Sequence, residues 1–235
     1  MKVDLLFLAF NRLEFTRESW KTLVVNTNWA RVNRLYVIDD GSTDGTAEFL
    51  QTAAYDREIG AVRELLEFRT GSPILAMIEF WKRARADLCA VTSNDVMLPP
   101  SWLDEVIKPF EKHPNLDALG IEALQPPVAT VAEARSYRHA HIISSLGLQR
   151  RSAFERFGLP QALKKYFGFD RWVSAHGTKI VRGWMEPAIP MFLLDRIPFA
   201  PWRQHSDRYT REGWQRRWPP YEKKDAHLWS WWQQP

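Results

Sequence analysis

The chain has 235 residues, enough for one α/β domain or a domain with an appended tail, and its 45% hydrophobic content is sufficient for a substantial core. The formal charge of +4 and the pI of about 9.2 give a mild basic bias, smaller than a non-specific nucleic-acid coat would need. A single cysteine, Cys89, excludes an intrachain disulfide and a cysteine-built zinc site, and no apolar stretch resembles a signal peptide or a membrane span. We therefore expect a cytoplasmic protein without stable membrane insertion.

The first half of the chain alternates between strand-like and helix-like patterns. In chain order we predict a strand at 3–10, a helix at 16–25, a strand at 34–40, a helix at 45–54, a helix opening at Ser72-Pro73, a strand at 88–95 and a helix from Pro100-Ser101 to His113. This alternation is typical of a mostly parallel sheet flanked by helices, with right-handed crossovers. The predicted fold class is therefore α/β.

Regular patterns become weaker after residue 115. We predict a strand within 116–124, a loop at 125–134, renewed strand character at 140–149, and a helix opened by a capping box of Ser152 and Glu155 and ended by Gly158. The last forty residues are rich in Trp, Arg and Pro and show no clear period. We therefore divide the chain into a domain at 1–185 and a C-terminal extension at 186–235.

Acidic residues follow two of the predicted strands. One strand leads into Asp39-Asp40 and the other into Ser93-Asn94-Asp95. The carboxyl ends of parallel strands lie at one edge of a sheet, where α/β proteins bind ligands. Carboxylates crowded there repel one another, which suggests a nucleotide bound with a divalent cation. The following residues, including Ser42, Asp44 and Thr46, suit either ligand binding or a polar turn that caps a helix.

Glycine-rich phosphate-binding motifs are missing from the sequence. It contains neither G-x-G-x-x-G after the first strand nor G-x-x-x-x-G-K-[ST] anywhere. This argues against dinucleotide-dependent oxidoreductases and P-loop enzymes. A nucleotide held by acidic groups without a glycine cradle fits a nucleotide-diphosphate sugar better.

Three motifs in order, "LLFLAFNR", "LYVIDDGSTDGT" and "VTSNDVMLPPSWL", resemble the N-terminal half of glycosyltransferase family 2, which has the GT-A fold. The likeness covers residues 3–112 and continues more weakly to about 183; the opening motif also resembles small bacteriophage glycosyltransferases. It implies that the donor is bound by Ala9, Phe10, Asn11 and Arg12 around the base, by Asp39 or Asp40 on the base, usually uracil, and by Ser42, Asn94 and Asp95.

The resemblance also implies a cofactor, Mn²⁺ or Mg²⁺, held at the D-x-D motif of the family. Asp95 matches the final carboxylate of that motif, but Ser93 replaces the first one. A metal would then depend on diphosphate oxygens, water and a distant side chain. His205 is the candidate for that ligand, with an ordinary surface histidine as the alternative. Metal dependence therefore stays open.

Asp170, in "FGFDRW", matches the region of the family's catalytic base. An inverting transfer needs a carboxylate that takes the proton of the incoming hydroxyl. Phe167, Phe169 and Trp172 would surround Asp170 with apolar bulk and raise its pKa. The alternative is that Asp170 only caps a helix.

The second half of the chain suggests the acceptor. Basic pairs such as Arg150-Arg151 and Lys164-Lys165, together with the late tryptophans, suit phosphate pairing and base stacking. We therefore favour DNA carrying a hydroxymethylated base, presented as a flipped base, and keep a protein or glycan acceptor as the alternative. Other classes that stay open are a non-catalytic nucleic-acid-binding module, a nucleotidyltransferase and a membrane-surface protein that uses the aromatic segment 228–232.

Overall fold

The computed structural model of the protein describes residues 1–53, 59, 62–121, 136–139, 147–161, 169–186 and 192–193. Within these residues an eight-stranded sheet has the order β3-β2-β1-β4-β8-β6-β9-β7. Its strands are β1 (Val3–Ala9), β2 (Val32–Asp39), β3 (Val62–Glu67), β4 (Leu88–Ser93), β6 (Ala118–Gly120), β7 (Ser136–His139), β8 (Gly147–Arg150) and β9 (Arg182–Glu186). β7 and β8 run against the other strands, so the sheet is mostly parallel, as predicted.

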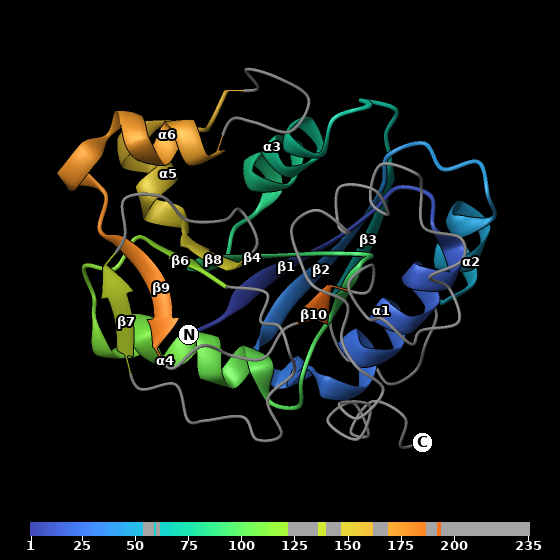
Figure 1. The fold of residues 1–235 in the computed structure, drawn as a ribbon, viewed down its shortest axis with the longest axis horizontal. Helices are drawn as coiled ribbons and strands as arrows, with labels where there is room; N and C mark the ends of the chain where they lie inside the picture. The colour runs from blue at the N-terminus through green and yellow to red at the C-terminus, as the bar shows by residue number, and fades with distance from the viewer. Residues whose placement is uncertain are drawn as a thin grey trace, which may run out of the picture.

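Helices cover both faces of this sheet (Figure 1). One face carries α1 (Leu13–Asn26), α2 (Thr46–Ala53) and α4 (Trp102–Lys112), and the other carries α3 (Pro73–Arg83), α5 (Arg151–Phe157) and α6 (Phe169–Ala175). Two short 3₁₀ helices, η1 (Trp29–Arg31) and η2 (Gly177–Lys179), precede β2 and β9. Within the described residues, no helix combines the length and apolar character that a membrane crossing requires.

The position of β1 inside the sheet, with helices on both faces, explains why the sequence of this strand is almost continuously apolar. Leu5 and Phe7 face the core under α1 and α4, whereas Leu6 and Leu8 face the core under α3. All four side chains are buried, and each contributes roughly 1.5–3 kcal/mol through removal from water. A strand covered on both faces is what the pattern predicted.

A second, two-stranded sheet joins distant parts of the chain. β5 (Val96–Met97) directly follows Asp95, and it pairs in antiparallel fashion with β10 (Phe192–Leu193). Two residues of the predicted C-terminal extension therefore return to the segment beside Asp95. The rest of that extension after residue 193 lies outside the described residues.

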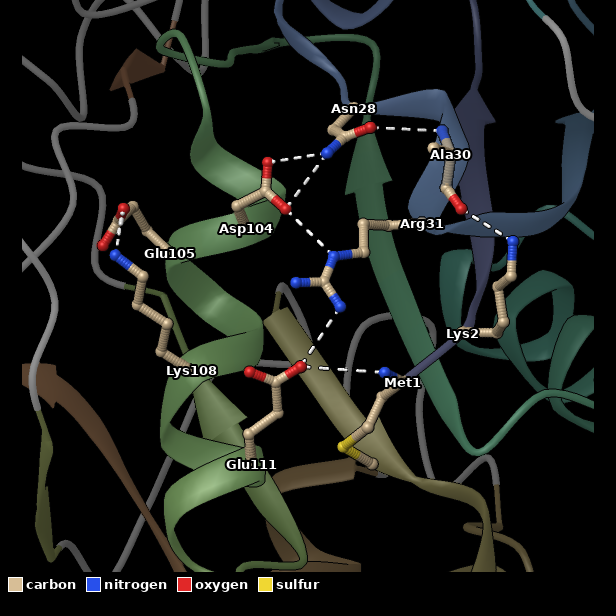
Figure 2. Close-up of polar contacts among 9 residues, drawn as sticks. All are labelled: Met1, Lys2, Asn28, Ala30, Arg31, Asp104, Glu105, Lys108 and Glu111. Atoms are coloured by element: carbon tan, nitrogen blue, oxygen red, sulfur yellow. Dashed lines mark hydrogen bonds and ion pairs between the residues drawn. The ribbon is translucent and has the colours of Figure 1, made fainter.

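Ion pairs fix α4 at the amino ends of β1 and β2 (Figure 2). The Arg31 guanidinium lies 3.1 Å from Asp104 through Nε and 3.1 Å from Glu111 through Nη1. The amino group of Met1 lies 3.6 Å from Glu111, and Asn28 donates to Asp104. This network lies at the opposite edge of the sheet from the acidic strand ends.

One prediction after residue 115 needs correction. The capping box of Ser152 and Glu155 is wrong, because β8 continues to Arg150 and α5 begins directly at Arg151. Ser152 therefore lies inside the first turn, and Glu155 forms an ion pair with Arg151 instead. The helix does end at Gly158, whose φ of 74° suits glycine. The predicted loop 125–134 lies outside the described residues, and only 118–120 and 147–149 of the two predicted strands are described as strand.

Candidate functional site

Both acidic strand ends lie at one edge of the sheet, as predicted. In the register of the parallel strands, Ala9 of β1 pairs with Asp39 of β2, and Leu8 of β1 pairs with Ser93 of β4. The bond from Asp40 N to Ala9 O is 2.9 Å long, and the bond from Asn94 N to Leu8 O is also 2.9 Å. The loops that follow β1, β2, β3 and β4 therefore meet here. We call residues 10–12, 40–44, 68–72 and 94–95 the rim.

Asn11 connects three of these loops. Its backbone N donates to Ser42 Oγ at 2.7 Å, and its Oδ1 accepts from Thr43 N at 2.8 Å. Its backbone oxygen accepts from Asn94 Nδ2 at 2.7 Å. Asn11, Ser42 and Asn94 were predicted from the sequence as donor-binding residues. The structure brings them together, and the polar atoms given above form hydrogen bonds with one another. Their first role is to hold the rim in shape.

The loop after β1 has an uncommon backbone. Asn11 and Arg12 have φ angles of 52° and 62°, and a left-handed backbone costs roughly 1–2 kcal/mol per residue other than glycine. Thr16 offsets this cost, because its backbone N donates to Arg12 O at 2.9 Å and its Oγ1 lies 3.1 Å from the same oxygen. Asn94 Nδ2 in turn donates to Thr16 Oγ1 at 2.8 Å. The sequence placed Thr16 only on a helix face and gave no signal for this contact.

Asp39 and Asp40 are buried, with 3% and 5% of their surface exposed. Asp39 accepts from the backbone N of Gly41 at 3.1 Å and of Ser42 at 2.9 Å, and also from Ser42 Oγ. Gly41 has a φ of 88°, and a Cβ added there would lie 3.0 Å from a side-chain atom of Arg69. Local backbone donors therefore stabilise the carboxylate of Asp39.

Asp40 is bound by the loop that follows β3. Its Oδ1 accepts from Thr70 N at 2.7 Å and from Thr70 Oγ1 at 2.8 Å, and its Oδ2 accepts from Ser72 N at 3.0 Å. Protein donors thus bind both acids, so crowding of carboxylates is not by itself a sign of a metal or nucleotide at Asp39 and Asp40. Thr70 is not among the residues predicted from the sequence, although it stands directly before Gly71-Ser72-Pro73.

Asp44 and Thr46 fit the polar-turn interpretation. Asp44 accepts from Leu13 N at 2.9 Å and from Thr46 N at 3.1 Å, so it links the starts of α1 and α2. Burial acts to raise the pKa of Asp44, but hydrogen bonds from Thr46 and Leu13 outweigh it, and the pKa lies below its ordinary value.

Asp95 differs from the other rim acids, because side chains rather than backbone groups bind it. Its Oδ1 accepts from Ser93 Oγ at 2.6 Å, and its Oδ2 lies 3.5 Å from Arg12 Nη1. The side chains of Arg12 and Asp95 are 28% and 27% exposed. Arg12 also lies over the ring of Phe15, 5.4 Å from its centroid. A part-exposed ion pair thus forms where the carboxyl ends of β1 and β4 meet.

The sequence of residues 5–165 matches the model of glycosyl transferase family 2. The chain belongs to this family. The resemblance to bacteriophage-type members stays a prediction, and a comparison with curated proteins finds no match.

Solved structures share the fold of this family 2 chain at low identity. TarS 1-349 of S. aureus in complex with UDP-GlcNAc is 12% identical, with a TM-score of 0.62 over 82% of this chain and 58% of that chain. The mannosyltransferase PcManGT of Pyrobaculum calidifontis in complex with GDP-Man and Mn²⁺ is 17% identical, with a TM-score of 0.61 over 78% of this chain and 56% of that chain. The chain thus spans less than two thirds of these proteins, and the likeness confirms the GT-A fold.

Within the described residues of this family 2 chain, no group of three or more His, Cys, Asp or Glu side chains could hold a metal ion. At the D-x-D position Asp95 is the single carboxylate, and both of its oxygens have partners, Ser93 and Arg12. Metal sites of this kind need several oxygen ligands. His205, the predicted distant ligand, lies outside the described residues.

Asp170 lies in α6, one residue after the helix begins. Aromatic contacts with α3 and α5 hold this helix, since Phe169 lies 5.5 Å from Trp81 and Trp172 lies 5.3 Å from Phe154, measured between ring centroids. The side chain of Asp170 and the residue Phe167 lie outside what the structure describes. The other candidates within 9–95 lie in the rim or, like Ala9 and Asp39, in the strand residues next to it. The catalytic role of Asp170 stays a prediction.

Proposed function

We propose that this protein transfers a hexose from a nucleotide-diphosphate sugar, with a UDP-sugar as the favoured donor, to an acceptor hydroxyl with inversion at the anomeric carbon. The observation that carries the proposal is the meeting of the β1, β2 and β4 ends in one hydrogen-bonded rim, within the region that matches the family. Similar folds in complex with UDP-GlcNAc and with GDP-Man support a nucleotide-sugar donor.

The nucleotide is assigned to the loop of residues 9–12 and to the segment 39–42. Phe10 exposes 50% of its surface beside Asn11, so it offers an aromatic face on which a base can stack. Asp39 and Asp40 are close to saturated by protein donors, and they contribute mainly by fixing the loops that line the base. Each of the two carboxylates would have one lone pair left, which could accept one hydrogen bond from the base.

The transfer step needs a base for the acceptor proton. The acceptor oxygen forms a bond to the anomeric carbon while the bond from that carbon to the diphosphate oxygen breaks, and the hydroxyl proton moves to a carboxylate. We assign this carboxylate to Asp170. Phe169 and Trp172, packed against α3 and α5, hold the helix that carries it.

Asp170→Asn tests this assignment. The variant should keep its fold and its affinity for UDP, and turnover should fall by about 10²–10⁴-fold, the usual size of a general-base contribution. Donor hydrolysis and transfer are measured with a labelled UDP-sugar. Wild-type turnover in a folded Asp170→Asn protein would remove Asp170 from the mechanism.

For the acceptor we favour a hydroxymethylated base in DNA, on the basis of the basic and aromatic composition of the second half. Two of the basic residues behind this idea have internal partners. Arg150 donates to Leu116 O and Phe110 O, and Arg151 forms an ion pair with Glu155. The idea therefore depends on the basic residues outside the described part, and a protein or glycan acceptor is the alternative.

An acceptor panel separates these possibilities. The enzyme is incubated with labelled UDP-glucose or UDP-N-acetylglucosamine and one of hydroxymethylcytosine DNA, unmodified DNA, a protein mixture or an oligosaccharide. Label on hydroxymethylcytosine DNA alone supports the favoured acceptor, and label on protein or glycan alone replaces it. If the protein binds DNA but neither transfers sugar nor binds nucleotides, the nucleic-acid-binding module would be favoured.

A further inference from the structure

The rim presents an arginine where metal-dependent nucleotide-sugar binding would place a cation. Ser93 stands in place of a carboxylate, and its hydroxyl donates to Asp95 at 2.6 Å. The Arg12 guanidinium lies 3.5 Å from the other oxygen of Asp95. The charge of Asp95 is thus already balanced by a fixed cation from the loop after β1.

The position of Arg12 is set by the rim itself. The left-handed backbone of Asn11 and Arg12 is held by hydrogen bonds with Ser42, Thr16 and Asn94, which belong to three different parts of the chain. Such a backbone persists only where its surroundings fix it. The rim therefore fixes the backbone from which the Arg12 side chain extends.

The chemistry of this pair suits a diphosphate. A guanidinium offers several N–H donors in one plane and binds phosphate oxygens in pairs. Because the Arg12 side chain is 28% exposed and its contact with Asp95 is long, the guanidinium can reach a phosphate without first breaking a buried ion pair. Asp95 without a metal, in contrast, would repel a diphosphate.

We propose that Arg12 binds the diphosphate of the donor directly, so that the nucleotide binds without a divalent metal ion, and that Asp95 restrains Arg12 rather than holding a metal. This inference rests on the proposed nucleotide-sugar donor. The inference predicts opposite effects on nucleotide binding for substitutions of Arg12 and of Asp95. Loss of the Arg12 charge weakens metal-free nucleotide binding, whereas loss of the Asp95 charge leaves it unchanged or strengthens it.

The experiment measures the dissociation constants of UDP, GDP and ADP by titration calorimetry, once with EDTA and once with MnCl₂. The proteins are wild type, Arg12→Gln, Arg12→Lys and Asp95→Asn. Arg31→Gln is the matched control, because Arg31 also forms an ion pair with an aspartate (Figure 2) and is 35% exposed, but it directly precedes β2, at the amino ends of the strands. Circular dichroism and urea unfolding check that each variant is folded.

We expect wild type and Arg31→Gln to bind a nucleoside diphosphate equally well in EDTA. Arg12→Gln should bind about 10-fold to 100-fold more weakly, as expected for a lost charge-assisted hydrogen bond, and Arg12→Lys should recover part of the affinity. Asp95→Asn should bind with unchanged or up to about fivefold tighter affinity. Arg12 acting only on stability would leave these affinities unchanged.

Four results would overturn the inference. Nucleotide binding by wild type only in MnCl₂ would make Asp95 a metal ligand while leaving the proposed function intact. Weaker binding by Asp95→Asn in EDTA would show that Asp95 supports nucleotide binding without a metal, and it would contradict a role limited to restraining Arg12. Unchanged affinity in Arg12→Gln would remove Arg12 from the diphosphate site. The lack of any binding by wild type to the three nucleotides in both conditions would instead contradict the nucleotide-sugar donor, and the inference with it.

Discussion

Replacement of Asp40 tests whether this acid is primarily a structural link between two loops. In Asp40→Asn the oxygen that faces Thr70 can remain an acceptor, but an NH₂ group then faces Ser72 N, which lies 3.0 Å from Oδ2 in the wild type. One hydrogen bond to a charged group is lost, while Ser72 N keeps its bond to Thr70 Oγ1 at 3.1 Å. A hydrogen bond to a charged group is worth about 1.5–3 kcal/mol, so we expect a loss of that size in the free energy of unfolding.

Urea unfolding followed by tryptophan fluorescence measures this loss. At a slope of roughly 2–3 kcal/mol per molar urea, the midpoint should fall by about 0.5–1.5 M. Asp104→Asn is the control, because Asp104 is 28% exposed in an ion pair with Arg31 and should lose less than about 1 kcal/mol. An Asp40→Asn protein as stable as the control, with unchanged slope, would show that the described hydrogen bonds do not hold the two loops together.

Further changes test other parts of the molecule. Burial raises the pKa of the Cys89 thiol, so a thiol reagent should label native protein only as fast as it unfolds; rapid labelling of folded protein would contradict the described burial. Ser93→Asp adds a carboxylate beside Asp95 and should raise the affinity for Mn²⁺, measured by calorimetry with UDP present; equal Mn²⁺ affinity in both proteins would argue against a missing ligand. Asp44 has a lowered pKa when folded, so its contribution is present above about pH 4 and is lost as the pH falls through its folded pKa. The difference in urea midpoint between wild type and Asp44→Asn should therefore shrink in acid, and a constant difference from pH 7 to pH 3 would refute this.

The sequence predicted the strands of the sheet centre but missed β3 and β7 at its two ends, and β9 beside β7. β1 and β4 lie between neighbours and beneath helices, so their residues are almost all apolar and easily recognised. β3 stands at the end of the strand order and pairs only with β2. Its segment "VRELLE" mixes charged and apolar residues, and Glu64 forms an ion pair with Arg34 of the neighbouring strand. Such a strand forms because it pairs with its neighbour, and its own sequence pattern does not predict it.

The position of the site was predictable, but its internal bonding was not. Strand direction alone placed Asp40 and Asp95 at one edge, because parallel strands end together. The partners of Asp40 come from residues thirty or more positions away, in a loop after β3, a strand that was missed. The left-handed backbone at Arg12 has no signal in the sequence either, since it depends on contacts with Thr16 and Asn94.

These contacts reduce the uncompensated negative charge at the rim. Backbone N–H groups bind Asp39 and Asp40 from within the protein, so their charges are largely compensated before any ligand arrives. Asp95 is compensated by Arg12, a cation that is itself part-exposed. A diphosphate that approaches the rim is therefore repelled less than the number of acids suggests. Of these groups, Arg12 is the one that can leave Asp95 and bind a phosphate instead. Binding and departure of the diphosphate would then depend on one side chain, so Arg12→Gln should lower both nucleotide affinity and turnover, whereas Asp170→Asn should lower turnover alone.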